Sequence, residues 1–260
     1  MEQEQSTKIE RDLRQIADML LLNGTLTECP GLVHGKIGIA VFFFHYAQYT
    51  DNMLFADYAM DLIGETMNQI HVNSPADYER GIAGIGVGID YLIQNNFLNV
   101  EDDICEDLDE RMVRAVLYDP WQDFSQYNGL TGYGRYWMTR LLYPAPSMQA
   151  RKCLMYIVKC IEERLPDVQE NDQSDVYRFL HDLQKIQGFV FCKGLLEQYR
   201  IWKLQLPDMK SKIDTALNQM TALDMEKAPT ATGLLSGYAG EGMLRLTALN
   251  KANSSWINLL

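Results

Sequence analysis

A short glycine pattern that recurs along the chain constrains its fold more than any other feature. Residues 231–250 form a glycine-spaced turn, at 233–240, that runs directly into an apolar helical segment. The same spacing occurs at residues 31–38, and shorter relatives lie at 81–88 and 129–134. An internal repeat of this kind limits the folds that the chain can adopt, because each repeat is expected to form the same structural unit.

The turns follow one another at a nearly constant interval. Gly35, Gly81, Gly129 and Gly237 mark the four turns, with intervals of 46, 48 and 108 residues, the last being two steps of 54. We therefore expect a fifth unit that has lost its glycines, with its turn near residues 180–190. Glycines at a helix entrance permit a tight turn and leave backbone N–H groups pointing toward the place where the turns converge.

Helical periodicity fills the space between the turns. We expect helices at residues 5–22, 39–49, 54–70, 89–97, 100–118, 136–142, 149–165, 175–205, 207–223 and 243–249, an exposed polar loop at 166–174, and an apolar tail at 256–260 that docks on the core. Alternation of β-branched residues is nearly absent, so we expect no sheet. The segment after each turn is the more apolar one, and a helix that is apolar nearly all round is buried on most sides.

This pattern predicts an all-α fold, an α/α toroid of about five helical hairpins with inner and outer layers, in one domain spanning residues 1–260. An open solenoid is the alternative, because it has a similar local pattern. The net charge of −12 and the pI near 4.8 argue against nucleic acid or an anionic membrane as the main partner and leave a basic or neutral peptide open.

The start of the chain shows no secretory signal, and no stretch reaches the length of a membrane span. The five cysteines are odd in number, widely spread and without a CxxC pair, which is typical of reduced thiols in a cytosolic protein. We therefore expect a cytoplasmic protein.

The repeats resemble those of lanthionine synthetase C-like (LanC-like) proteins. The resemblance lies in GLVHGKIGIAVFFFHYA, ERGIAGIGVGIDYLIQNNFL, YNGLTGYGRYW and GLLSGYAGEGMLRLTALN, and the closing SSWINLL is similar to that family's C-terminus. It covers most of the chain from about residue 30. The resemblance implies a toroid of inner and outer helices, which the family usually builds from more repeats than this chain has.

The family's cyclases hold zinc between two cysteines and a histidine, and the zinc lowers the pKa of a substrate cysteine so that its thiolate adds to a dehydroalanine or dehydrobutyrine. This sequence departs from that ligand set, because its last repeat has neither Cys nor His and no Cys-His-Gly occurs anywhere. The fragment Phe191-Cys192-Lys193-Gly194 faintly matches the family's Trp-Cys motif, and His181 is the only nearby partner for Cys192. Two such ligands are too few for a zinc site, so we predict no metal and no other cofactor.

His34 lies inside the first glycine turn, where the resemblance implies a functional histidine that donates a proton into the lumen. Its plain alternative is a histidine that only hydrogen-bonds nearby backbone. Asp123, before the third turn, and Glu241, after Gly240, are the other candidate catalytic residues. Two carboxylates with Trp121 and Trp137 to stack on sugar rings would also suit a glycoside hydrolase or lyase, which many α/α toroids are.

The candidate ligand-binding residues lie near the glycine turns and would line one end of the toroid if the turns converge. They are Tyr78, Glu79, Arg80, Tyr127, Arg135 and Tyr238. Tyrosines and paired charges suit a peptide-binding mouth, although each residue alone could equally cap a helix or pair within its own repeat.

The sequence therefore favours a LanC-like accessory protein in peptide modification, which binds a peptide or a modifying-enzyme partner without zinc-dependent cyclase activity. The alternatives are an active enzyme, either an atypical thioether cyclase or a carbohydrate-active hydrolase or lyase, and a plain scaffold without a pocket.

Overall fold

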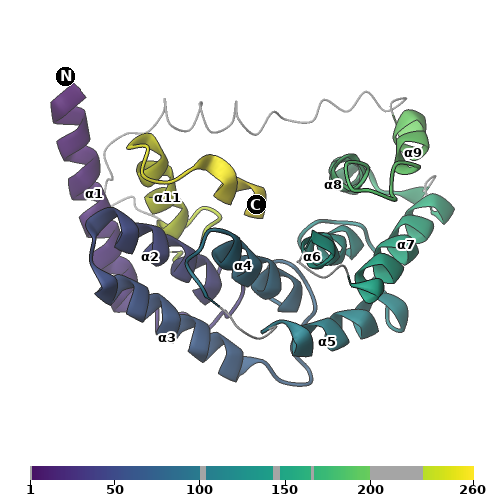
Figure 1. Cartoon of the computed structure of the whole chain (residues 1–260), viewed down its shortest axis with the longest axis horizontal. Coiled ribbons are helices and arrows are strands. Elements are labelled where there is room, and N and C mark those ends of the chain that lie inside the picture. The colour runs from purple at the N-terminus through teal and green to yellow at the C-terminus, as the bar shows by residue number, and fades with distance from the viewer. Residues whose placement is uncertain (1, 100–103, 143–146, 165–166, 200–230) are drawn as a thin grey trace. The chain divides into compact units, whose positions relative to one another are not determined.

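A computed structural model describes residues 2–99, 104–142, 147–164, 167–199 and 231–260 (Figure 1). These residues form helices joined by turns, and no strand occurs among them, as the sequence predicts. The chain divides into two compact units, and one of the boundaries between them along the chain falls inside a helix, between Val87 and Gly88. Each unit is described by itself below.

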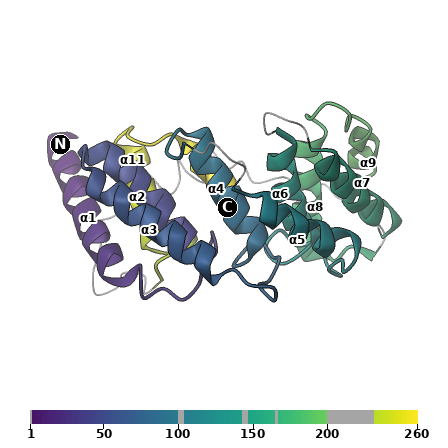
Figure 2. The same ribbon diagram turned by 60° about the horizontal axis from the view of Figure 1, so that its bottom comes forward.

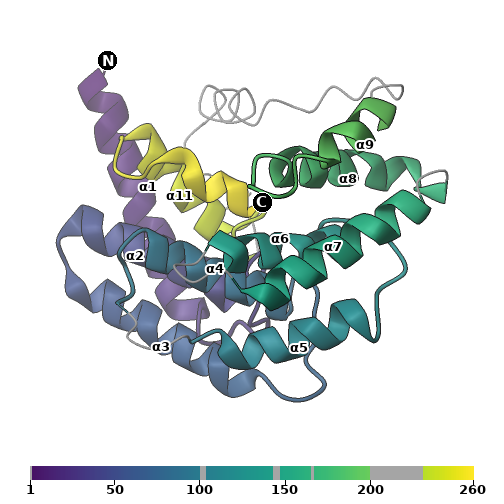
Figure 3. The same cartoon turned by 45° about the vertical axis from the view of Figure 1, so that its right-hand side comes forward.

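Unit 1 is built from the two ends of the chain and the second half of α4. Its elements are α1 (Glu2–Asn23), α2 (Lys36–Thr50), α3 (Met53–Gln69), the part of α4 (Ile82–Gln94) from Gly88 onward, α11 (Tyr238–Ala248) and the 3-10 helix η3 (Ser254–Leu259). Helices α2 and α3 lie side by side (Figure 2), and α11 packs against both α1 and α2 (Figures 1 and 3).

Unit 2 holds the first half of α4 and the middle of the chain. Its other helices are α5 (Glu106–Leu117), α6 (Leu130–Leu142), α7 (Met148–Glu163), α8 (Glu170–Leu183) and α9 (Cys192–Tyr199). Helix α7 packs against α5 and α6, and α8 packs against α6 and α9. The single domain that we expected stays a prediction.

The helices from α1 to α7 alternate between amphipathic and largely buried ones. Every residue of α2 from Lys36 to Ala47 is buried, whereas α3 buries only the stripe formed by Ala56, Ala59, Leu62, Ile63 and Thr66. Helix α7 likewise buries one stripe of its surface, and α4 is buried from Ile82 to Leu92. The apolar pattern predicted this alternation, but α8 and α9 depart from it, because each of them buries only part of its surface.

The four glycine turns share one backbone hydrogen bond. The N–H of the first helical residue donates to the carbonyl oxygen seven residues earlier: Lys36 to Cys29 (3.0 Å), Ile82 to Pro75 (3.0 Å), Leu130 to Asp123 (3.1 Å) and Tyr238 to Ala231 (3.0 Å). The marker glycine stands just before this residue. A Cβ on Gly35 or Gly81 would overlap a carbonyl oxygen of the entering loop, so the closed turn leaves no room for a side chain.

The second glycine of each repeat lies inside the helix, not in the turn as we expected. Gly38, Gly132 and Gly240 stand three positions after the marker glycine, within the first turn of their helices. A Cβ at each would overlap a carbonyl oxygen of the entering loop, that of Leu234 in the case of Gly240. Close packing of each helix on its own loop, rather than a special backbone angle, accounts for these glycines.

The repeat without the glycine pair has a different turn, at residues 184–191. The N–H groups of Cys192, Lys193 and Gly194 donate to carbonyl oxygens three residues earlier, at 3.0 to 3.1 Å, which are bonds of the 3-10 type. Gly188 provides the left-handed backbone, with φ 95°. The turn predicted near residues 180–190 therefore exists, but other hydrogen bonds close it.

The polar loop expected at residues 166–174 is wrong, because α8 begins at Glu170. The Asp172 carboxylate accepts the N–H of Phe124 at 3.2 Å, and Asp175 accepts that of Gln126 at 2.8 Å. Asp172, in the first turn of α8, favours the helix N-terminus, and both acids bind the loop of the third repeat. Helix α5 begins at Glu106 rather than near residue 100. The acidic run at 101–103, the prolines at 144–146 and the helix predicted at 207–223 lie outside the described residues.

We expect Gly240→Ala to destabilise unit 1 by about 1–3 kcal/mol, because the added methyl group must displace the backbone at Leu234. Gly64 is the matched control: it also lies in a helix, it is exposed, and no atom stands within 4 Å of the position of its Cβ. Gly64→Ala should add about 0.5–1 kcal/mol of stability. Urea unfolding followed by circular dichroism measures both, and equal effects would contradict this packing argument.

Candidate functional site

The loops of the first and last repeats lie directly against each other within unit 1. The Leu235 N–H donates to the carbonyl oxygen of Val33 at 3.1 Å, and the hydroxyls of Thr27 and Thr232 are 3.0 Å apart. A Cβ on Gly233 would overlap the backbone of His34, so glycine is required for this approach. The start and the end of the repeat series are therefore neighbours.

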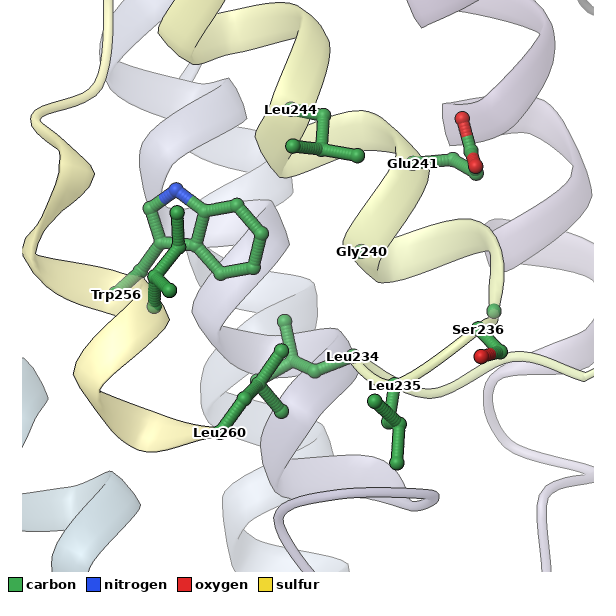
Figure 4. Close-up of a pocket in the computed structure, with 10 residues that line it drawn as sticks. Leu234, Leu235, Ser236, Gly240, Glu241, Leu244, Trp256 and Leu260 are labelled. Atoms are coloured by element: carbon green, nitrogen blue, oxygen red, sulfur yellow. The ribbon is translucent and has the colours of Figure 1, made fainter. Parts of the chain in front are cut away.

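A pocket of about 280 Å³ opens beside this junction, between the last repeat and η3 (Figure 4). The described residues that line it are Leu234, Leu235, Ser236, Gly237, Gly240, Glu241, Leu244, Trp256, Ile257 and Leu260. Most of these side chains are apolar, and Glu241 is the one charged side chain among them. Ser236, at its exposed edge, has a left-handed backbone with φ 56°, which is uncommon outside glycine.

Trp256 forms one wall of the pocket and is held in place. Its side chain is buried, and its indole N–H donates to the hydroxyl of Thr247 at 3.0 Å. Asn253 caps η3 by accepting the N–H of Ser255 at 2.9 Å. The apolar tail predicted to dock on the core does so, and the pocket therefore has a preformed wall.

A buried histidine lies behind η3. His45 Nε2 is 2.8 Å from the hydroxyl of Tyr91, which also has a side-chain hydrogen bond with Ser255, and the His45 ring stands edge-on to Phe97. Nδ1 of His45 has no hydrogen-bond partner among the described residues. Burial lowers the pKa of His45 to about 4, so the ring is neutral in the folded protein at physiological pH.

Glu241 belongs to a three-residue ion cluster. Arg245 donates from Nη1 to Glu241 Oε2 at 2.5 Å, and its Nε lies 3.3 Å from Oδ2 of Asp12 in α1. The side chains of Arg245 and Asp12 are 2% and 4% exposed, whereas that of Glu241 is 37% exposed. The cation is therefore buried, and one of its two carboxylates reaches the pocket.

The other site residues predicted in unit 1, His34 and Tyr238, do not line the pocket. His34 is partly exposed and supplies backbone to the junction with Gly233. Tyr238, the first residue of α11, is 6% exposed, so its ring lies in the core. Of the predicted site residues of unit 1, only Glu241 is a lining residue.

Four residues of the predicted ligand-binding group come together in unit 2. The N–H groups of Tyr78 and Glu79 donate to the carbonyl oxygen of Tyr127 at 2.9 and 3.1 Å, and the Arg135 guanidinium lies 5.7 Å from the centre of the Tyr78 ring. Tyr78 is completely buried, and this burial raises the pKa of its hydroxyl. Arg80 points its exposed side chain toward solvent, 3.9 Å from the Glu79 carboxylate. This cluster joins the second and third repeats, and its role in ligand binding stays a prediction.

The two candidate catalytic carboxylates belong to different units. Asp123, in unit 2, accepts the indole N–H of Trp121 at 2.9 Å and the N–H of Ser125 at 3.1 Å, so it closes the loop of the third repeat. Trp137 is completely buried against Tyr136, so a sugar ring cannot reach it, and the expectation that it stacks on substrate is wrong. Trp121 remains exposed.

The cysteine considered for zinc lies in the core of unit 2. Cys192 is buried, and burial raises the pKa of its thiol to about 11. His181, its possible partner, stacks on Tyr177 and lies 3.4 Å from the Asp182 carboxylate. In the described parts of the chain, no three His, Cys, Asp or Glu side chains stand close enough to hold a metal ion.

Sequence reasoning missed most of the pocket lining. Leu234, Leu235 and Leu244 belong to the last repeat, but the predicted site residues were charged and aromatic residues near the turns. Two features of the sequence could have indicated this lining. One is the pair of adjacent leucines inside the glycine turn of the last repeat, and the other is the apolar tail soon after it, which we predicted to dock on the core.

No helix in the described ranges is both long enough and apolar enough to cross a membrane. A scan of the chain against models of known protein families finds no match, and a search of curated proteins finds no significant one. The resemblance to LanC-like proteins therefore rests on the repeat residues quoted above.

Proposed function

We propose that this protein binds peptides in the pocket beside α11, as a LanC-like accessory protein in peptide modification that lacks zinc-dependent cyclase activity. The pocket carries the proposal. It is walled by leucines, an isoleucine and a fixed tryptophan, and Glu241 is the one charged side chain among the described lining residues. Apolar pockets with a few placed polar groups are the usual form of ligand sites.

A peptide suits this pocket better than a large rigid ligand. The volume of about 280 Å³ accommodates an apolar side chain or two but not an extended ligand. Buried aromatic and aliphatic anchors in such pockets contribute most of the affinity of peptide and protein partners. The rest of the peptide would then lie on the exposed rim near Ser236.

The contact between the first and last repeats supports the toroid within this proposal. In an open solenoid each repeat contacts only its neighbours in sequence, so the first and the last stay apart. Here Leu235 donates to Val33, and α11 packs on α2. We therefore propose a ring-like order of repeats with LanC-like helical hairpins, in a cytoplasmic protein whose partner is a peptide or a peptide-modifying enzyme.

The absence of cyclase chemistry is part of the proposal and follows from the sequence. The Cys and Cys-His ligands that the resemblance implies are missing from the last repeat. The second candidate function, an enzyme with two carboxylates, gains no supporting contact among the residues that the structure describes. It stays a prediction, as does the role of His34 as a proton donor.

Selection from a phage-displayed library of random dodecapeptides tests the proposal. We expect the protein to enrich peptides with an apolar anchor, and we expect Leu244→Glu, which puts a charge into the pocket wall, to lower their affinity about tenfold or more. Leu54→Glu is the matched control, because Leu54 is 72% exposed on α3 of the same unit. If no peptide is enriched, or if Leu244→Glu binds the selected peptides unchanged, this function is wrong.

A further inference from the structure

Glu241 is the one charged side chain among the described residues that line the pocket. In Figure 4 it lies on the far side of the first turn of α11 from Trp256, with its carboxylate directed away from the indole. Its carboxylate is more than a third exposed, whereas the guanidinium of Arg245 that it contacts is buried. A ligand in the pocket therefore meets the carboxylate before it meets the cation.

The cation behind Glu241 is shared. Arg245 contacts Asp12 on one side and Glu241 on the other, so two carboxylates stand on one guanidinium. When all three groups are ionised, the cluster carries one negative charge, and the carboxylate that reaches the pocket is the exposed one. The chain as a whole carries a net charge of −12, which has the same sign. The negative charge of the cluster and the negative net charge of the chain both favour a positive charge next to the apolar part of a ligand.

We propose that the pocket selects peptide segments in which an apolar side chain adjoins a lysine or arginine. This inference rests on the proposed peptide-binding function and gives it a substrate class. The apolar side chain lies between Leu234, Leu244 and Trp256, and the neighbouring cation contacts the Glu241 carboxylate. A glutamate or aspartate at that neighbouring position is disfavoured, because it would face a carboxylate of like charge.

The test reads the sequences of the selected peptides. The dodecapeptide library is selected on the wild-type protein, on Glu241→Gln and on Asp61→Asn, which removes one negative charge from an exposed position of α3 in the same unit. In the wild-type pool, Lys and Arg next to the apolar anchor should exceed Asp and Glu about fivefold relative to the starting library. Glu241→Gln should abolish this bias, and Asp61→Asn should keep it.

A repeat of the wild-type selection at high salt makes the test independent of any variant. Exposed charge pairs weaken in salt, so the cationic bias should shrink while apolar anchors remain enriched. An enriched pool without cationic bias, or a bias that persists in Glu241→Gln, would overturn this inference and leave peptide binding standing. A selection that enriches nothing would overturn peptide binding itself.

Discussion

Arg245→Met is expected to destabilise the protein by about 3–5 kcal/mol, because it leaves the buried carboxylate of Asp12 beside α11 without this cation. The guanidinium is 2% exposed and contacts both Asp12 and Glu241, so water cannot take its place without a change in packing. Urea unfolding followed by circular dichroism gives the free energy of unfolding.

Lys159→Met provides the control for loss of a cation. Lys159 forms an exposed pair with Glu163 in α7, at 3.5 Å, and such pairs contribute about 0–1 kcal/mol. The double variant Asp12→Asn, Arg245→Met should recover part of the loss, because it removes the buried negative charge together with its partner. A loss for Arg245→Met no larger than that for Lys159→Met would contradict the buried ion cluster.

Acid is expected to destabilise the wild-type protein by about 3 kcal/mol more than it destabilises His45→Gln. The pKa of His45 falls from 6.5 to about 4 on folding, so between these pH values the unfolded chain binds more protons than the folded one. The stability that the neutral ring contributes is complete above pH 6.5 and is lost as the pH falls from 6.5 to 4.

Free energies of unfolding at pH 7.5 and pH 4 for the two proteins measure this difference. Carboxylates that titrate in the same range are common to both proteins and cancel in the comparison. Glutamine keeps a polar group near the hydroxyl of Tyr91, which lies 2.8 Å from His45 Nε2 in the wild type. If the free energy of unfolding falls equally in the two proteins between pH 7.5 and pH 4, then His45 is not a buried neutral ring that becomes protonated only on unfolding.

The repeats could be predicted from sequence because glycine has a local signature. Each marker glycine stands where a hydrogen bond to a backbone carbonyl closes the turn, just before a helix begins. The intervals between these glycines along the chain therefore indicate where successive helices begin. The apolar run after Gly35 likewise indicated that α2 is buried along its length. The polar segment 166–174 misled the prediction, because α8 begins within it and the acids Asp172 and Asp175 of that helix bind a loop about fifty residues away in sequence.

The site could be predicted only in part, because its contacts join distant parts of the chain. Glu241 was found from its place beside a turn, but its link through Arg245 to Asp12 spans 233 residues. No local pattern indicates that η3 would supply a wall opposite α11, or that Tyr78 would be buried beneath Arg135 rather than exposed. Charged and aromatic residues beside the turns led us to predict that these side chains lie near one another. The sequence did not indicate which of them are buried, because their burial depends on the tertiary fold.

The discontinuity of unit 1 has a consequence for the protein during synthesis. Its first three helices leave the ribosome long before α11 and η3 exist, because the whole middle of the chain is translated in between. Until then α11 cannot cover the apolar surface of α2, whereas α5 to α8 can already assemble among themselves. Contacts this far apart in sequence also form slowly. Nascent chains stalled before residue 231 should therefore bind chaperones through α1 and α2, whereas released full-length chains should not.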